Sequence, residues 1–316
     1  MWRILDIAQP GRTLSLEREA VKVSTDGAEI ARIPIRDVAA LLVHGRGTML
    51  TLNLADALAT AGAPVVLCGA NHAASSVLLP VAGHFEHAGR LHAQAAASLP
   101  MRKRLWAELV REKVRAQAGA LGGGVGADAA RLAKLAQSVR SGDPQNIEAQ
   151  AARLYWPRLM GADFRRDREA EGPNAALNYG YAVLRAAMSR QVVASGLSPA
   201  LGLHHRSRLN PFQLVDDLME PFRPLVDRTV ADAPERFGEA LTPEAKATLA
   251  SVVDLPLEAD EGLIPATRAM ERLCASLCAV FQGEGKRLWR PRSWRAARHG
   301  AFDFSGDAPG GGGADA

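Results

Sequence analysis

The stretch from Gly202 to Pro221, GLHHRSRLNPFQLVDDLMEP, places two adjacent histidines before a cluster of carboxylates. Asp217 and Glu220 are three residues apart and Asp216 and Glu220 are four apart, so a helix would crowd these carboxylates on one face. Such repulsion costs roughly 0.2–0.5 kcal/mol per pair in an isolated helix. A divalent cation would offset that cost, and carboxylate oxygens with one imidazole suit Mg²⁺ or Mn²⁺.

The same stretch has a second interpretation, a solvated acidic face that Arg206, Arg208 and Arg223 balance. Asn210 followed by Pro211 is typical of an N-cap and a first helical residue, so the sequence predicts a helix that begins at Pro211. The histidines then lie just before this helix. The stretch alone leaves both interpretations open.

A second window, SGDPQNIEAQAARLYWPRLMG, contains one more candidate ligand, Glu148. Asp143 and Pro144 predict the start of a helix, and small residues surround the glutamate before Tyr155 and Trp156. A carboxylate among small and apolar neighbours favours a binding role. Partial exposure, or an ion pair with an arginine, is the alternative.

Cationic residues are mostly arginine, 32 of 38, which favours a polyanionic partner because guanidinium binds phosphate in a bidentate way. A genome rich in arginine codons would explain the same bias. The segment KRLWRPRSWRAAR, residues 286–298, alternates cations with two tryptophans, as in surfaces that bind phosphates and stack on bases. A helix with its tryptophans in the core is the alternative. The candidate DNA contacts are Arg206, Arg208, Lys286, Arg287, Arg290, Arg292 and Arg295.

The elements that must position these groups fall into two parts. The runs RILDI, RTLSLE, AVKVST and EIARIPI, separated by turn residues, predict strands in hairpins and a meander. A strand, helix, strand unit follows, and from about residue 88 apolar residues recur at helical spacing. One predicted helix runs from Ala175 to about Ala194 and is closed by Gly196.

We therefore expect an α+β protein with a small N-terminal β-rich domain over residues 1–85 and a larger all-helical catalytic domain over residues 86–300. Residues 301–316 lack apolar content and predict a disordered tail.

The uncharged residues 57–83 predict buried strands and loops, since proline, glycine and polar residues interrupt any membrane span. The start, MWRILDIAQPGRTLSLE, has charge and turn residues where a signal peptide would need an apolar stretch, and the three cysteines lack a disulfide pattern, so we expect a reducing, cytoplasmic setting. Cys274 and Cys278 are expected in the core.

The motifs GDPQNIEAQAARLYW and GLSPALGLHHRSRLNPFQLVDDLMEPFRPLVD, in this order and spacing, resemble the CRISPR-associated spacer-acquisition integrase family in its type II form. The N-terminal half is similar through RILDI, LSLER, IPIRDVAALLVHG and VVLCGANH. The resemblance covers nearly the whole chain except its C-terminal tail.

The resemblance implies a divalent metal bound by a glutamate, a histidine and a second acidic residue, which match Glu148, His205 and Glu220. Asp217 matches an acidic position behind these ligands or near the DNA, and His204 precedes the histidine position as its neighbour. The resemblance further implies an N-terminal domain that forms a homodimer, a small ferredoxin-like partner protein that bridges two dimers, and double-stranded array DNA as the target.

Such a metal polarises a phosphate and steadies the oxygens of an in-line displacement. A DNA 3′-hydroxyl as nucleophile gives strand transfer and water gives nicking; the resemblance, and not the residues, selects integration of spacers. Two other functions stay open. A metal-dependent phosphodiesterase acting on small molecules would lack salt-dependent DNA binding, and a non-catalytic DNA-binding scaffold would bind DNA normally after Glu148→Ala or Glu220→Ala.

Overall fold

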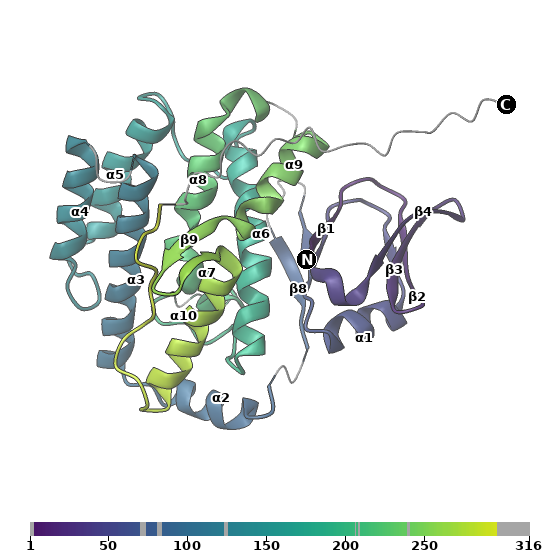
Figure 1. The fold of residues 1–316 in the computed structure, drawn as a ribbon, viewed down its shortest axis with the longest axis horizontal. Coiled ribbons are helices and arrows are strands. Elements are labelled where there is room, and N and C mark those ends of the chain that lie inside the picture. The colour runs from purple at the N-terminus through teal and green to yellow at the C-terminus, as the bar shows by residue number, and fades with distance from the viewer. Residues whose placement is uncertain are drawn as a thin grey trace.

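The computed structural model describes residues 3–69, 74–80, 84–122, 126–205, 207, 209–238 and 241–295. Strands gather in the N-terminal part and helices in the rest (Figure 1). This mixed α+β arrangement agrees with the fold class that the sequence predicts. The predicted disordered tail, residues 301–316, lies outside the described residues.

The N-terminal part contains two four-stranded sheets, in the orders β1-β5-β7-β8 and β4-β3-β2-β6. β1, β5 and β7 are parallel, whereas β8 is antiparallel to β7. The sequence of β5, VAALLV, is apolar along its length because both faces of this strand are covered. The elements are β1 Arg3–Ile7, β2 Thr13–Glu17, β3 Ala20–Thr25, β4 Ala28–Pro34, β5 Val38–Val43, β6 Met49–Leu50, α1 Leu52–Thr60, β7 Val65–Cys68 and β8 Ala74–Leu78.

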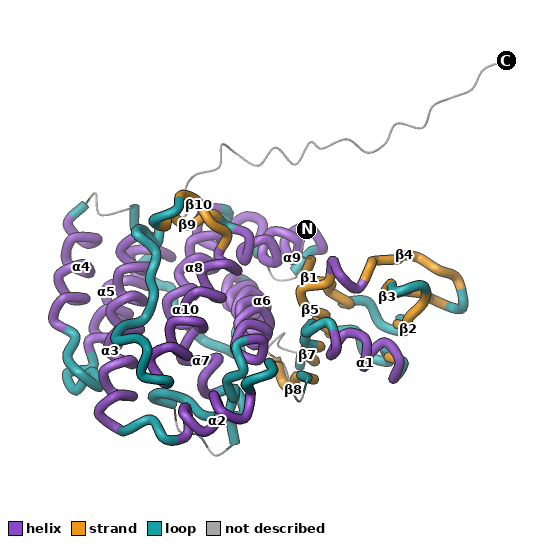
Figure 2. The backbone as a smooth tube through the Cα atoms, turned by 60° about the horizontal axis from the view of Figure 1, so that its bottom comes forward, coloured by secondary structure: helices purple, strands orange, loops and turns teal. Residues whose placement is uncertain are grey.

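The C-terminal part is built mainly of helices that pack around α3 and α6 (Figures 1 and 2). Its elements are α2 His87–Ala95, α3 Leu99–Ala120, α4 Ala127–Ser138, α5 Ile147–Met160, α6 Pro173–Ala194, α7 Gln213–Met219, the 3-10 turn η2 Glu220–Phe222, α8 Arg223–Asp232, α9 Pro243–Ala250, β9 Pro256–Ala259, β10 Gly262–Pro265 and α10 Ala266–Phe281. The antiparallel hairpin of β9 and β10 shows that the expectation of an all-helical part was wrong.

α6 joins the two parts of the molecule. Tyr179 Oη donates a hydrogen bond to Asp6 Oδ2 at 2.9 Å, and Arg190 donates to the carbonyl oxygens of Val38, Ala39 and Ala61 at 3.1 Å. Arg190 thus places positive charge at the carbonyl oxygens of the start of β5 and of the C-terminus of α1. The helix was predicted to within two residues at its start.

Two other helix starts differ from the prediction. α5 begins at Ile147 after Asn146, whose backbone is left-handed at φ +52° and whose side chain accepts a hydrogen bond from Ala149 N. Asp143 instead accepts from the backbone N–H groups of Ile147 and Glu148. α7 begins at Gln213 rather than Pro211, because Asn210 Oδ1 accepts from Phe212 N and keeps one more turn outside the helix.

Cys274 and Cys278 are buried on α10, as predicted. None of the helices in the described part of the chain combines the length and the apolar composition that a membrane crossing needs.

Candidate metal and DNA site

Two of the predicted ligands, Glu148 and Glu220, meet at one ammonium group. The Lys113 Nζ atom lies 2.6 Å from Glu148 Oε1 and 2.5 Å from Glu220 Oε2. Lys113 comes from α3, Glu148 from the first turn of α5 and Glu220 from η2, so three separate elements converge here. The proposed alternative, a Glu148 paired with a cation, is thus what the structure contains, with lysine in place of arginine.

Glu220 is buried, with 4% of its surface exposed, and is nevertheless ionised. Burial alone would raise the pKa of its carboxyl, but Arg223 and Lys113 together hold the pKa below its usual value. Arg223 Nη2 lies 3.1 Å from Glu220 Oε1. Glu220 Oε2, although 2.5 Å from the ammonium, lacks hydrogen-bond geometry to any described group, so its lone pairs are not fully used.

Asp217 organises the loop that carries both histidines. It is fully buried, and its carboxylate accepts hydrogen bonds from the backbone N–H groups of Leu203 at 2.6 Å, His204 at 3.0 Å and His205 at 3.4 Å. His205 Nδ1 lies 2.5 Å from Asp217 Oδ1, and this hydrogen bond raises the pKa of the imidazole. Since Nδ1 is engaged, Nε2 is directed away from Asp217, as in carboxylate, histidine and metal arrangements.

His204 and Asp216 have other contacts. The His204 ring stacks on Trp106, with centroids 4.3 Å apart and planes within 5°. Asp216 pairs with Arg185 at 2.8 Å and accepts a hydrogen bond from Asn210 at 2.7 Å. The crowded carboxylates of the sequence are therefore not neutralised by one shared cation, because each has partners of its own.

The three candidate ligands lie in one neighbourhood but do not form a closed metal cage. His205 and Glu220 are close enough that each shifts the pKa of the other. Within the described residues, no group of three His, Cys, Asp or Glu side chains has the spacing that holds a metal ion. Lys113 occupies the space between the two glutamates, whereas His205 is turned onto Asp217.

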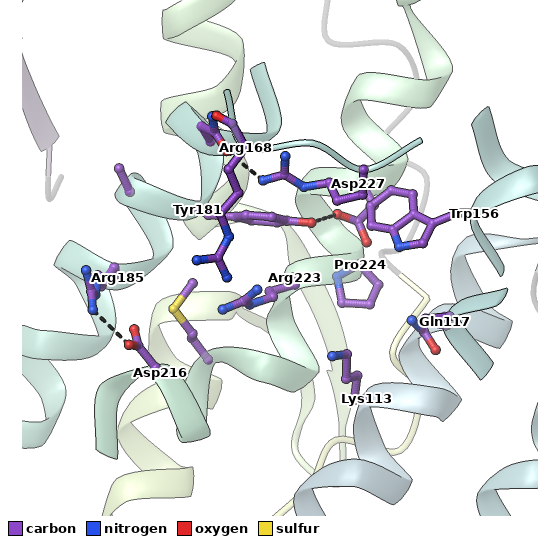
Figure 3. A pocket seen from close by; sticks show the side chains of 15 residues that line it. Lys113, Gln117, Trp156, Arg168, Tyr181, Arg185, Asp216, Arg223, Pro224 and Asp227 are labelled. Carbon is purple, nitrogen blue, oxygen red and sulfur yellow. Dashed lines mark hydrogen bonds and ion pairs between the residues drawn. The ribbon is translucent and has the colours of Figure 1, made fainter. Parts of the chain in front are cut away.

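A cavity of about 280 Å³ opens beside Lys113 (Figure 3). Two guanidinium groups lie near the Tyr181 ring, that of Arg166 at 5.5 Å and that of Arg223 at 5.0 Å from its centroid. Its hydroxyl donates to Asp227, which also accepts from Tyr155 Oη at 3.0 Å. Burial raises the pKa of Asp227 to about 6, against the lowering effect of both hydroxyls.

Sequence reasoning missed Lys113 and Asp227. A signal for Lys113 was present, because it interrupts the apolar stripe formed by Val110 and Val114 on the buried side of α3. The signal for Asp227 was its spacing: it lies seven residues after Glu220, and in consecutive helical turns this places both side chains on the same side.

The predicted DNA contacts near the C-terminus lie on the other side of α3. Lys286, Arg287 and Arg290 line a cavity of about 470 Å³ with Arg104, Arg111 and Arg115. Arg292 pairs with Asp260 at 2.5 Å on the surface, and Arg295 is exposed. Arg206 and Arg208 lie outside the described residues.

The two tryptophans of this segment pack onto the protein and do not extend into solvent. Trp294 is buried, stands edge-on against Phe222 and donates from Nε1 to Glu112 at 2.8 Å. Trp289 is partly buried, with the Arg272 guanidinium 5.7 Å from its ring centroid. The core interpretation is confirmed for Trp294 and in part for Trp289, although residues 286–295, the described part of the segment, do not form a helix.

The family model described as CRISPR associated protein Cas1 matches residues 5–236. The CRISPR-associated endonuclease Cas1 of Neisseria meningitidis serogroup C is 39% identical over 295 residues, which cover 92% of this chain and 96% of that protein. Among solved structures, a casposase bound to integration product aligns with a TM-score of 0.77 at 18% identity, over 96% of this chain and 97% of that one. A Cas6-RT-Cas1–Cas2 complex aligns with a TM-score of 0.73 at 15% identity, over 91% of this chain and 36% of that one.

Proposed function

The chain belongs to the Cas1 family of CRISPR-associated proteins, as endonuclease and integrase of spacer acquisition, and we propose that Glu148, His205 and Glu220 hold its divalent metal. One observation carries this proposal: two carboxylates from different elements converge on a single cation position, with His205 beside them. The family expected from the motifs is confirmed by the matching family model and by the 39% identical relative, while the metal site is an inference from geometry.

The residues fit a hard divalent cation such as Mg²⁺ or Mn²⁺. Glu220 is ionised although buried, and its Oε2 atom has unused acceptor capacity. The Lys113 ammonium shows that the site accommodates positive charge between the two glutamates. A bound metal would supply Lewis-acid activation of a phosphate during an in-line displacement. Oxygen ligands with one imidazole suit these ions, and Mn²⁺ tolerates the imidazole more readily.

Other residues of the chain would orient the proposed ligands. Asp217 fixes the His205 ring through Nδ1 and so sets the direction of Nε2. Arg223 holds Glu220 Oε1 and thereby orients the carboxylate. The stacked Trp106 ring keeps His204 in place as a neighbour of the ligand, consistent with the supporting position that we propose for it.

We propose double-stranded DNA as substrate, both as spacer precursor and as repeat. The cavity lined by Lys286, Arg287 and Arg290 is suited to backbone phosphates, and we propose the exposed Arg295, and Arg292 on release from Asp260, as further contacts. Arg206 and Arg208 remain proposed phosphate contacts from the sequence alone. One solved neighbour of the same fold, at a TM-score of 0.54 and 20% identity, is a TtCas1-DNA complex, which supports DNA as the partner.

We further propose that the chain acts in the cytoplasm as a homodimer through an N-terminal domain of residues 1–85, joined to a catalytic domain of residues 86–300. The edge strand β4 is exposed along nearly its whole length, including Ile30, and such an edge can pair with a second copy. A small ferredoxin-like protein would bridge two dimers. A solved neighbour that joins Cas1 and Cas2 in one complex supports a second CRISPR-associated protein as that partner.

The test is strand transfer of a short duplex into a plasmid that carries a repeat, with Mn²⁺, with Mg²⁺ and with chelator. Glu148→Ala, His205→Ala and Glu220→Ala are expected to lose joining, whereas Glu235→Ala, an exposed carboxylate, keeps it. His204→Ala is expected to retain most activity, because its neighbour is the proposed ligand. Full joining by the three ligand variants would refute the site.

The alternatives give different results in the same experiment. A phosphodiesterase that acts on small molecules would bind DNA without a steep salt dependence. A non-catalytic scaffold would bind DNA equally before and after substitution and would join no ends under any metal condition.

A further inference from the structure

The ammonium of Lys113 lies where a metal between Glu148 and Glu220 would have to lie. Its Nζ atom is 2.6 Å and 2.5 Å from the two carboxylate oxygens, so it fills the space between them that a bridging ion would need, although Mg²⁺ would draw its oxygen ligands closer, to about 2.0–2.1 Å. Lysine is rarely buried unless it is paired, and here both partners are proposed metal ligands. The ammonium and a metal ion therefore exclude each other at this point.

A second position for the ammonium exists one helical turn away. Gln117 is four residues after Lys113 on α3, so the two side chains lie on the same face. Gln117 is 3% exposed, and its Oε1 atom has no hydrogen-bond partner within the described residues. A buried acceptor without a donor is costly, and such atoms in native proteins call for an explanation.

Space for this movement is present. Lys113 and Gln117 both line the cavity of about 280 Å³, where Figure 3 shows them below Arg223, Tyr181 and Asp227. A lysine side chain has four rotatable carbon bonds and can change its rotamer without moving the helix. Asp227, at the far wall, offers additional negative charge to an ammonium that turns into the cavity.

We propose that Lys113 is a built-in competitor for the divalent cation, a proposal that rests on the metal site inferred above. Without metal its ammonium bridges Glu148 and Glu220 and neutralises them. With metal it turns toward Gln117 Oε1 and leaves both carboxylates to the ion. The metal must displace an internal cation, so its affinity is set by Lys113 and Gln117 as well as by the ligands.

Calorimetric titration of the full chain with Mn²⁺ at pH 8, together with thermal melting of the metal-free protein, tests this. Lys113→Met keeps an unbranched side chain only one atom shorter and removes the charge. We expect Mn²⁺ to bind about tenfold more tightly, equivalent to about 1.4 kcal/mol, because the competitor is gone. The metal-free variant should melt at a lower temperature, since two carboxylates are left facing each other. Lys134→Met, an exposed lysine on α4, should leave both measurements unchanged.

Gln117→Leu provides a second variant with the opposite expectation. This substitution removes the acceptor that the displaced Lys113 ammonium would use, so displacement by the metal becomes less favourable. Mn²⁺ binding should therefore weaken about fivefold, roughly 1 kcal/mol. The metal-free protein should melt no earlier than the wild type, because a buried acceptor without a partner has been removed. Unchanged or weaker Mn²⁺ binding by a folded Lys113→Met protein, or unchanged binding by Gln117→Leu, would overturn the proposal.

A Glu148→Ala protein separates this inference from the proposed function. If this variant binds Mn²⁺ as the wild type does, the metal lies elsewhere, and both the site and the role of Lys113 are refuted. If it loses Mn²⁺ binding while Lys113→Met and Gln117→Leu bind as the wild type does, the site stands and the role of Lys113 alone is refuted.

Discussion

Replacing Asp217 by asparagine tests how the loop before α7 holds the histidine. Asparagine has the same shape, but one carboxylate oxygen becomes an NH₂ group, which donates and cannot accept. Oδ2 of Asp217 accepts from the N–H groups of Leu203 and His204, and Oδ1 accepts from the backbone and the ring of His205. Whichever way the amide turns, one pair of donors faces another donor.

The expected loss follows from these contacts. A hydrogen bond to a charged group contributes about 1.5–3 kcal/mol, and a donor left without an acceptor costs about 1–3 kcal/mol. Two donors lose their acceptor and the loop relaxes in part, so we expect the free energy of unfolding to fall by about 3 kcal/mol. The His205 ring would also lose its fixed direction, and substitutions behind a metal-binding histidine typically weaken metal affinity about 10–100-fold.

Urea denaturation of the metal-free protein and calorimetric titration with Mn²⁺ measure the two effects separately. Asp216→Asn is the matched control, since its carboxylate pairs with Arg185 and Asn210 and touches neither histidine. The control should lose less than half as much stability and retain its Mn²⁺ affinity. An Asp217→Asn protein whose Mn²⁺ affinity lies within about twofold of the wild type would show that this carboxylate does not position His205.

Three further outcomes follow from the structure. The pKa of Asp227 is raised from 3.8 to about 6, so the protonated carboxyl is the form that the fold favours. The free energy of unfolding of the wild type, relative to that of Asp227→Asn, should be greatest below pH 4 and fall by about 3 kcal/mol as the pH rises through 6. Urea denaturation of both proteins from pH 4 to 7.5 checks this. Trp294→Ala should lower the free energy of unfolding by about 3–5 kcal/mol, because a buried ring and its hydrogen bond to Glu112 are removed. Urea denaturation measures this loss. A variant as stable as the wild type would mean that the C-terminal segment is not part of the core. Lys286→Ala should reduce the slope of log K for DNA against log salt by about 1, whereas a slope equal to that of the wild type would remove this lysine from the DNA interface.

The sequence predicted the N-terminal strands and the long helix α6 well because of their patterns of apolar residues, but it missed the β9–β10 hairpin. β5 is apolar at every position, and α6 ends where Gly196 adopts a positive φ of +71°. Helix starts were predicted less well, since Asp143 and Asn146 are both good capping residues and only the folded backbone selects between them. The left-handed Asn146 caps α5, while Asp143 reinforces it from three residues earlier.

The family resemblance implied one site for Glu148 and Glu220 but could not identify the cation between them. Lys113 is 35 residues before Glu148 along the chain, and its contact with both glutamates arises only when α3 packs against α5 and η2. Nor could the sequence show which of the neighbours Asp216 and Asp217 contacts His205. These neighbours point to opposite partners because successive helical residues face about 100° apart.

Two buried carboxylates near the cavity, Glu220 and Asp227, have pKa values shifted in opposite directions, and this difference assigns their roles. Both lose solvation, yet Glu220 has two cations at its oxygens, Arg223 and Lys113, whereas the direct contacts of Asp227 are the hydroxyls of Tyr155 and Tyr181. Hydroxyls stabilise a carboxylate less than cations do, so the pKa of Asp227 stays raised. Between pH 5 and 7 the charge of the cavity therefore changes at Asp227, while Glu220 remains an anion that can hold either Lys113 or a metal ion.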